Sequence, residues 1–266
     1  IKQKNGHAGV IAKIEKPEAL DEIDEIIEVT DGVMVARGDL GVEVSFDRVP
    51  MIQKLIVEKC IAKAKPVIIA TQMLESMMVN FTPTRAEAND VANAVLDGAD
   101  ALMLSGETSI GKYPVQTIRS MQRIINYTET RGNIFNKQYF PVTDSPTFLA
   151  ETICFNAVLL TQQTGAKAII AISNSGHTVY RLASHRPGAN VFAFTNNKKL
   201  LQKLSLVWGV QAFYVESFEM INEVYLESIK ILKMNHLIED GDTVVHIGSI
   251  PLNQRGSANM IKLTQV

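Results

Sequence analysis

Four short apolar segments recur in the first half of the sequence at intervals of about 30 residues, and each is followed by residues with helical spacing. The first apolar segment covers residues 10–12 and leads into Lys13, Ile14 and Glu15, and the other three cover residues 32–36, 67–70 and 101–104. The first of the helices that follow begins near Pro17, and the other three cover residues 49–64, 87–96 and 114–128. Such alternation is typical of a parallel sheet with helices on its faces, either an open sheet or a closed barrel.

Polar residues stand at the carboxyl end of every one of these segments, and they decide between the two architectures. They are Lys13, Glu15, Asp39, Thr71, Ser105 and Glu107. Polar groups from four successive strands converge more easily on the mouth of a barrel than on one crevice of an open sheet. We therefore expect an α/β fold in which residues 1–130 form part of a (β/α)8 TIM barrel.

The number of strands predicts an incomplete barrel. A closed barrel of this type has eight strands in about 250 residues, whereas only four fall in about 130 residues here. Half a barrel leaves two open parallel edges. Residues 1–7 contain neither an initiator methionine nor a leader pattern. We expect the native polypeptide to continue upstream of Ile1.

A second α/β domain is predicted after residue 146. Glycine, two prolines and polar residues interrupt the periodicity at 131–146, which we interpret as a linker. Residues 147–266 then contain a helix at 147–164 and strands at 167–172, 190–194, 210–215, 243–247 and 260–263. We expect a sheet of about five strands whose last two form a hairpin-like end.

The composition excludes several classes of partner. Only 20% of the residues are charged and the net charge is -2, so no strong field recruits nucleic acid or an anionic membrane. No apolar run reaches the roughly 18 residues that a membrane span needs, which favours a soluble protein. Cys60 and Cys154 lie in apolar helical patterns, where cysteine is typically a buried hydrophobe, and this suits a reducing cytoplasm.

Two carboxylates are candidate ligands of a divalent metal ion. Lys13 and Glu15 are two residues apart on a strand, so their side chains share one face. A surface salt bridge is the plain alternative for that pair, and a turn aspartate is the plain alternative for Asp39. Glu15 and Asp39 together form the kind of site that Mg²⁺ uses with substrate oxygens and water. Backbone amides near Gly38 are candidates for binding a carboxylate or phosphate.

Two hydroxyl groups directly follow buried strands. Thr71 follows the third apolar segment, and Ser105 follows the fourth with Glu107 two residues later. Such residues often cap helices. Together they are candidates for a proton path in which Glu107 sets the donor state of Ser105. No Gly-x-x-x-x-Gly-Lys-Ser/Thr loop is present, so a nucleotide needs another mode of binding.

Longer motifs resemble the pyruvate kinase family in order and spacing. They are VIAKIE at 10–15, MVARGDLG at 34–41, ATQMLESM at 70–77, PTRAE at 83–87, DVANAVLDGAD at 90–100 and LMLSGET at 102–108. The resemblance is dense from residue 8 to about 125 and continues more loosely to the C-terminus. It implies the last four βα units of the barrel, followed by the family's α/β C-terminal domain.

The resemblance also implies an activity and its cofactors. Members of the family transfer the phosphoryl group of phosphoenolpyruvate to ADP, giving pyruvate and ATP, with Mg²⁺ (or Mn²⁺) and K⁺. The family's K⁺ ligands and much of its nucleotide contact belong to barrel strands that this sequence lacks. We therefore expect this chain alone to be inactive.

The family's roles fall on the matched positions of this sequence. Lys13 would stabilise charge on the phosphoryl group and the enolate, and Glu15 and Asp39 would hold the divalent ion. Gly38, Asp39 and Thr71 would bind substrate. The route that protonates the enolate would pass near three residues, namely Thr71, Ser105 and Glu107.

Further expectations concern regulation and assembly. The loop before a predicted helix near Thr178 resembles the family's site for a phosphorylated effector, although a capped turn without ligand is the alternative. Its residues are Ser173, Asn174, Ser175, Gly176, His177 and Thr178. The resemblance places Arg85 at a subunit interface of a homotetramer.

Two other functions remain open from the sequence. The first is another metal-dependent barrel enzyme that acts on pyruvate enolates, such as a carbon-carbon lyase. The second is a regulatory fragment that binds a phosphorylated effector through residues 173–178 without catalysis.

Overall fold

The computed structural model describes residues 8–135, 140–216, 221–250 and 258–266. Residues 1–7, whose sequence favoured an upstream extension, lie outside that description. The chain divides into two units, Ile1–Ile134 and Phe135–Val266. The division falls inside the segment 131–146 that the sequence marks as a linker.

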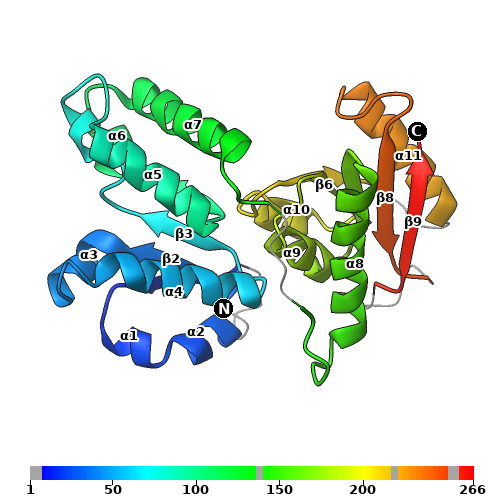
Figure 1. The fold of residues 1–266 in the computed structure, drawn as a ribbon, viewed down its shortest axis with the longest axis horizontal. Coiled ribbons are helices and arrows are strands. Elements are labelled where there is room, and N and C mark those ends of the chain that lie inside the picture. The colour runs from blue at the N-terminus through cyan, green and yellow to red at the C-terminus, as the bar shows by residue number, and fades with distance from the viewer. Residues whose placement is uncertain (1–7, 136–139, 217–220, 251–257) are drawn as a thin grey trace. The chain divides into compact units, whose positions relative to one another are not determined.

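The first unit is built on a four-stranded parallel sheet (Figure 1). Its strands lie side by side in chain order: β1 (Ile11–Ile14), β2 (Gly32–Ala36), β3 (Val67–Ala70) and β4 (Ala101–Met103). The predicted βα units and the parallel sheet are confirmed. The fourth strand ends one residue earlier than the apolar pattern suggested.

Helices follow every strand of this sheet. They are α1 (Glu18–Asp21), α2 (Ile23–Val29), α3 (Arg37–Glu43), α4 (Val49–Ala62), the 3-10 helix η2 (Glu75–Met78), α5 (Arg85–Asp97), α6 (Gly106–Ser109) and α7 (Pro114–Arg131). The helix predicted near Pro17 is thus two short helices. α4 contacts β2 and β3, and α5 packs against α7.

The segment after β2 corrects one expectation. The sequence predicts no helix between residues 36 and 49 and offers a turn aspartate as the plain alternative for Asp39, but α3 begins at Arg37 and continues to Glu43. Tertiary packing outweighs the low helix propensity of glycine, because Leu40 is fully buried and Arg37 is 8% exposed. Asp39 therefore lies in the first turn of a helix.

The second unit contains the predicted five-stranded sheet, in the order β7-β6-β5-β8-β9. Its elements are α8 (Phe148–Thr164), β5 (Ala168–Ile172), α9 (His177–Ser184), β6 (Asn190–Thr195), α10 (Lys198–Leu204), β7 (Val210–Tyr214), α11 (Ile221–Met234), β8 (Thr243–Gly248) and β9 (Met260–Gln265). β8 and β9 pair antiparallel, which confirms the hairpin-like end, while the other pairs are parallel.

Alternate residues of β5 divide the core of this unit into two layers. Ile169 and Ala171 pack in the same cluster as residues of α8, α9 and α10, whereas Ala168 and Ile170 pack with Leu232 of α11. Successive side chains of a strand point to opposite faces, so helices cover both faces of the sheet. Figure 1 shows α8 and α11 on the two sides.

Both cysteines have the environment that their sequence context predicted. Cys60 in α4 and Cys154 in α8 are free thiols with no exposed surface. Burial raises the pKa of each thiol to about 12, so both act as small buried hydrophobes.

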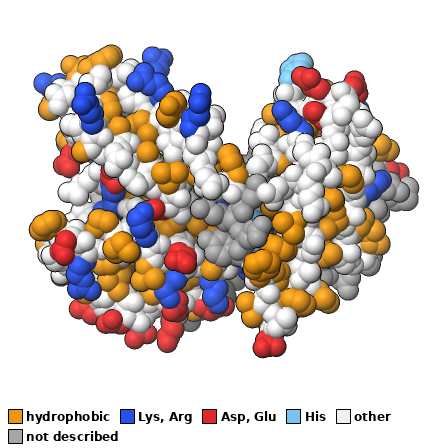
Figure 2. Space-filling view, viewed as in Figure 1, with side chains coloured by type: hydrophobic (Ala, Val, Ile, Leu, Met, Phe, Trp, Pro, Cys, Tyr) orange, Lys and Arg blue, Asp and Glu red, His pale blue; other side chains and the backbone are white. Residues whose placement is uncertain are grey.

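The surface carries charges of both signs. Figure 2 shows acidic and basic side chains over the same face of the molecule, together with separate hydrophobic ones, in line with a net charge of -2. Among the described residues, no helix has the length and apolar character needed to cross a membrane.

Candidate active site

The register of the first sheet places the predicted polar residues at one edge. Ile14 pairs with Val35, while Ala36 pairs with Ala70 and Ala70 with Met103. The carboxyl ends of all four strands therefore lie level. Residues that directly follow the strands therefore lie at the same edge of the sheet, as they do at the mouth of a barrel.

Lys13 joins two carboxylates that come from different elements. Its Nζ lies 2.8 Å from Oδ2 of Asp39 in α3 and also forms an ion pair with Glu15 at the end of β1. The side chains of Lys13, Glu15 and Asp39 are 49%, 36% and 57% exposed, so solvent reaches all three. The two predicted carboxylates thus converge on a single cationic atom.

These contacts keep both Lys13 and Asp39 charged. Hydrogen bonds to Asp39 and Glu15 raise the pKa of Lys13 to about 12. The hydrogen bond from Lys13, followed by its charge, lowers the pKa of Asp39 below the usual value. At neutral pH the edge of the sheet therefore presents the ammonium group of Lys13 beside the ionised carboxylate of Asp39.

The donor set fits a hard divalent cation. Carboxylate oxygens of Glu15 and Asp39 already meet within reach of one positive atom, and Mg²⁺ sites commonly use two carboxylates, with water and substrate oxygens completing the octahedron. No group of three or more His, Cys, Asp or Glu side chains in the described parts of the chain is placed to hold a metal by itself. The protein offers a partial site rather than a closed cage.

Thr71 occupies a strained backbone position directly after β3. Its φ angle is 68° and that of Gln72 is 55°, a left-handed conformation that is rare for a β-branched residue. Each such residue costs about 1–3 kcal/mol and persists only when its surroundings hold it. Strain of this kind is concentrated at functional sites, and here it falls on a predicted substrate-binding residue.

The hydroxyl of Thr71 links β3 to α3. The backbone N–H of Gly38 donates to Oγ1 of Thr71 at 2.7 Å, and that hydroxyl donates to the carbonyl of Ala70 at 2.5 Å. A Cβ atom on Gly38 would lie 3.3 Å from the same Oγ1, a tight contact that glycine avoids. The structure thereby brings the predicted residues Gly38 and Thr71 together beside Asp39.

Glu107 ties two strand-end segments through their backbones. Its carboxylate is 3% exposed and accepts the N–H groups of Leu74, at 3.2 Å, and Ser105, at 2.8 Å. These bonds join the segment after β3 to the segment after β4. Glu107 therefore contacts the backbone of Ser105, whereas the proton-path hypothesis assigned it to the hydroxyl.

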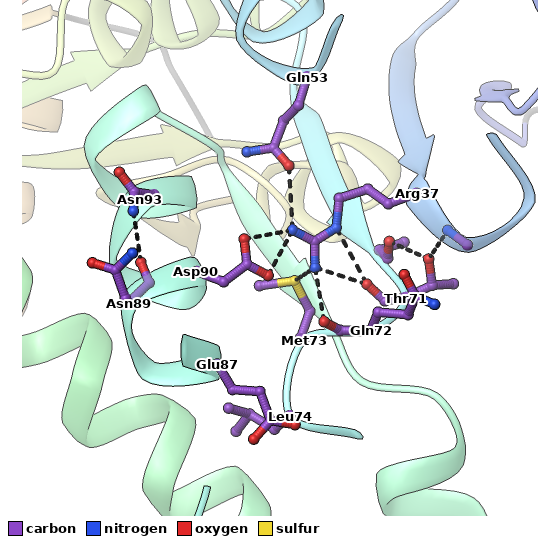
Figure 3. A network of polar contacts seen from close by, with 12 residues as sticks. Arg37, Gln53, Thr71, Gln72, Met73, Leu74, Glu87, Asn89, Asp90 and Asn93 are labelled. Atoms are coloured by element: carbon purple, nitrogen blue, oxygen red, sulfur yellow. Dashed lines mark hydrogen bonds and ion pairs between the residues drawn. The ribbon is translucent and has the colours of Figure 1, made fainter. Parts of the chain in front are cut away.

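Arg37 is a residue of this site that the sequence analysis did not single out. Its guanidinium group is buried and contacts the carbonyls of Thr71 and Gln72 and the carboxylate of Asp90 (Figure 3). The signal available in the sequence was a cationic residue directly after a fully apolar strand. Such a charge is rarely buried without partners.

Two further predicted sites lie apart from the Lys13 group in the sequence. Arg85 is exposed at the start of α5, where Thr84 and Glu87 form a reciprocal capping box. In the second unit, the N–H of Gly176 donates to Oγ of Ser173 at 3.0 Å, which closes the loop before α9.

The loop at 173–178 leaves part of its polar surface open to solvent. Asn174 and Ser175 are exposed, and His177 and Thr178 are partly buried in the first turn of α9. The Gly176 position has a φ angle of 89°, which suits glycine. The loop follows the carboxyl end of β5, the usual side for ligand sites in parallel sheets.

Parallel βα units with polar residues gathered at the carboxyl ends of their strands are typical of the class of α/β-barrel domains. Two family models identify the member of this class. The barrel domain of pyruvate kinase matches residues 1–118, and the α/β domain of pyruvate kinase matches residues 151–264. The chain belongs to the pyruvate kinase family, and this assignment favours a pyruvate kinase over the lyase alternative.

Individual relatives support the same assignment. A pyruvate kinase of Lactobacillus delbrueckii subsp. bulgaricus is 43% identical over 96% of this chain and 44% of its own length. One from Mycobacterium tuberculosis is 43% identical over 97% of this chain and 54% of its own length. The crystal structure of a pyruvate kinase from Cryptosporidium parvum superposes with a TM-score of 0.88 at 34% identity, covering 97% of this chain and 51% of that one. The chain thus spans about half the length of the relatives it matches.

Proposed function

We propose that this chain supplies half of the catalytic site of a pyruvate kinase that transfers the phosphoryl group of phosphoenolpyruvate to ADP, forming pyruvate and ATP in cytoplasmic glycolysis. The observation that carries the proposal is the meeting of Lys13, Glu15 and Asp39 at the strand ends. Family membership supports the identity of the substrates. The same relationship supports a homotetramer with Arg85 at a subunit interface.

Lys13 provides the positive charge for phosphoryl transfer. The transferring group passes through a state whose charge is spread over its oxygens, so catalysis depends on placement and electrostatics more than on a nucleophile. The raised pKa of Lys13 supports this role, because the ammonium group stays charged over the physiological range. Two carboxylates hold the group at the end of β1.

Glu15 and Asp39 bind the divalent cation, Mg²⁺ or Mn²⁺. When bound, such an ion would supply positive charge that neutralises substrate oxygens. The backbone at Gly38 and Asp39 and the hydroxyl of Thr71 bind substrate beside it. Ser105 and Glu107 border the route by which the enolate gains its proton. The K⁺ ligands belong to the part of the barrel that this chain does not contain.

The chain alone is expected to be inactive, because half of the site is missing. Within the described residues, β1 and β4 are both edge strands of the first sheet. Joining the chain to the N-terminal half of a relative, such as the Lactobacillus delbrueckii enzyme, tests the proposal. The completed protein should form pyruvate in a Mg²⁺-dependent reaction, and a folded, completed protein without this activity would refute the proposal.

Regulation through residues 173–178 is a second part of the proposal. The exposed side chains of Asn174 and Ser175, next to the first turn of α9, support binding of a phosphorylated effector. Titration of the 266-residue chain with a sugar phosphate, followed by NMR, tests this directly. Chemical-shift changes confined to residues 173–178 would support an effector site. Unchanged signals would mean that the loop is a capped turn without a ligand.

A further inference from the structure

We propose that Arg37 is a positioning residue, whose guanidinium group holds the left-handed turn at Thr71 and Gln72 and thereby sets the Thr71 hydroxyl in the site. The inference deepens the proposed pyruvate kinase function and rests on it. Arg37 itself is 8% exposed and directly follows β2, so it acts through another residue.

The guanidinium group binds the strained turn through its backbone. Nη2 donates to the carbonyl of Thr71 at 2.9 Å and to that of Gln72 at 3.0 Å, and Nε lies 3.3 Å from the Thr71 carbonyl (Figure 3). Both residues have positive φ angles. In this conformation their two carbonyl oxygens face the same cation, which favours the left-handed turn over a relaxed backbone.

Two helices hold the other side of the guanidinium group. Both carboxylate oxygens of Asp90 in α5 lie 2.7 Å from Nη1, and Oε1 of Gln53 in α4 lies 3.4 Å from it (Figure 3). A buried arginine with a charged partner and several acceptors is rigid. α4, α5 and the segment after β3 are therefore fixed to one planar group.

The Thr71 hydroxyl connects this arrangement to the candidate active site. Once the turn is fixed, Oγ1 of Thr71 lies 2.7 Å from the N–H of Gly38, next to Asp39. Lysine cannot replace Arg37 here, because an ammonium group lacks the planar fork that spans two carbonyls and a carboxylate. The contacts of Arg37 are thus specific to arginine.

Gly38 provides a reporter that needs no catalytic activity. It is the second residue of α3, and the first amides of a helix have no acceptor within the helix. Protection of its N–H from hydrogen exchange therefore depends on Thr71. In the 266-residue chain, Arg37→Lys should speed exchange at Gly38 by about tenfold or more, while amides of β2 and β3 stay protected.

A matched control substitutes another arginine. Arg48→Lys changes an exposed residue before α4 and should leave exchange at Gly38 unchanged. Unchanged exchange at Gly38 in a folded Arg37→Lys variant would overturn the proposal. If that variant loses the protection of β2 and β3, Asp90→Asn replaces it, and it too must speed exchange at Gly38 for the proposal to stand.

A kinetic cycle in the completed kinase separates positioning from general structural support. Arg37→Lys should lower kcat by about tenfold to a hundredfold, with KM for ADP within about twofold of the parent value. In a Thr71→Val background the same substitution should change kcat by less than about twofold, because the group it positions is already absent. If Arg37→Lys lowers kcat by the same factor in the parent and in the Thr71→Val background, the proposal is overturned. An inactive completed parent would refute the proposed function instead, and the exchange result would still decide the geometry.

Discussion

The Nζ atom of Lys13 lies 2.8 Å from Oδ2 of Asp39, although 26 residues separate them in the chain. The contact arises because β1 and β2 are parallel neighbours whose carboxyl ends are level, so the helix after β2 begins beside the end of β1. Glu15 joins the same lysine. The fold thus gathers a cation and two carboxylates without any local sequence motif that contains all three.

Asp39→Asn should weaken binding of Mn²⁺ to the 266-residue chain by about tenfold or more, since a charged ligand is lost. Electron paramagnetic resonance of free Mn²⁺ measures the change. The matched control is Glu43→Gln, which alters another carboxylate of the same helix that pairs with Lys16. Equal affinity for Mn²⁺ in the Asp39→Asn and Glu43→Gln variants would remove Asp39 from the metal site.

Gly38→Ala should separate stability from activity. Alanine favours the helix by up to about 1 kcal/mol, but its Cβ would lie 3.3 Å from Oγ1 of Thr71 and push the hydroxyl away. In the completed enzyme we expect turnover to fall about tenfold or more without loss of thermal stability.

The control for this substitution is Gly41→Ala in the same helix. A Cβ there would meet only Cγ2 of Val49, at an ordinary 3.8 Å. Turnover should be unchanged and stability equal or higher. A Gly38→Ala enzyme with parental kinetics would show that the close approach of Gly38 to Thr71 does not affect turnover.

Glu107→Gln should destabilise the first unit by about 1–3 kcal/mol, because an amide group cannot accept two backbone N–H groups as the carboxylate does. The bonds at risk are those from Leu74 and Ser105. Urea denaturation measures the loss, and Glu75→Gln, at an exposed carboxylate of η2, is the control. A variant as stable as its parent would mean that these bonds do not hold the two segments together.

Stability of the second unit should fall in acid because of His246. This residue of β8 is 1% exposed, its ring lies 4.3 Å from that of Tyr225, and burial lowers its pKa from 6.5 to about 4. Between these pH values His246 binds a proton in the unfolded state but stays neutral in the folded state. Stability is therefore full above pH 6.5 and decreases by about 3 kcal/mol as the pH falls to 4.

His246→Leu should remove most of this pH dependence, which denaturation midpoints at pH 7.5 and pH 4.5 would reveal. His236→Asn, at an exposed position with a φ angle of 56°, should keep it. If the loss of stability in acid is the same in both variants, another group is responsible.

Local sequence patterns were sufficient for much of the fold. The apolar runs that became β2 and β3 have the predicted bounds, because a strand covered on both faces needs an unbroken apolar segment. The hairpin of β8 and β9 followed from spacing alone. α3 was missed, since the glycines at 38 and 41 outweighed a single buried leucine in a local pattern.

The candidate site was predictable in its residues but only partly in its contacts. Lys13, Glu15 and Asp39 stood out because charged groups at the carboxyl ends of apolar segments need a polar site. The role of Arg37 was not accessible, because its partners Thr71 and Asp90 lie 34 and 53 residues away and only tertiary structure brings them together. The bonds from Glu107 to two backbones were hidden for the same reason.

The most direct test of the proposed function measures pyruvate formation by the completed protein in three forms: parent, Lys13→Met and Lys16→Met. Lys16 is the matched control, because it is also an exposed lysine paired with a carboxylate of α3. The parent and Lys16→Met proteins should turn over at similar rates in the presence of Mg²⁺, and Lys13→Met should lose at least about a thousandfold in kcat while still binding Mn²⁺. Near-parental turnover by Lys13→Met would contradict the account.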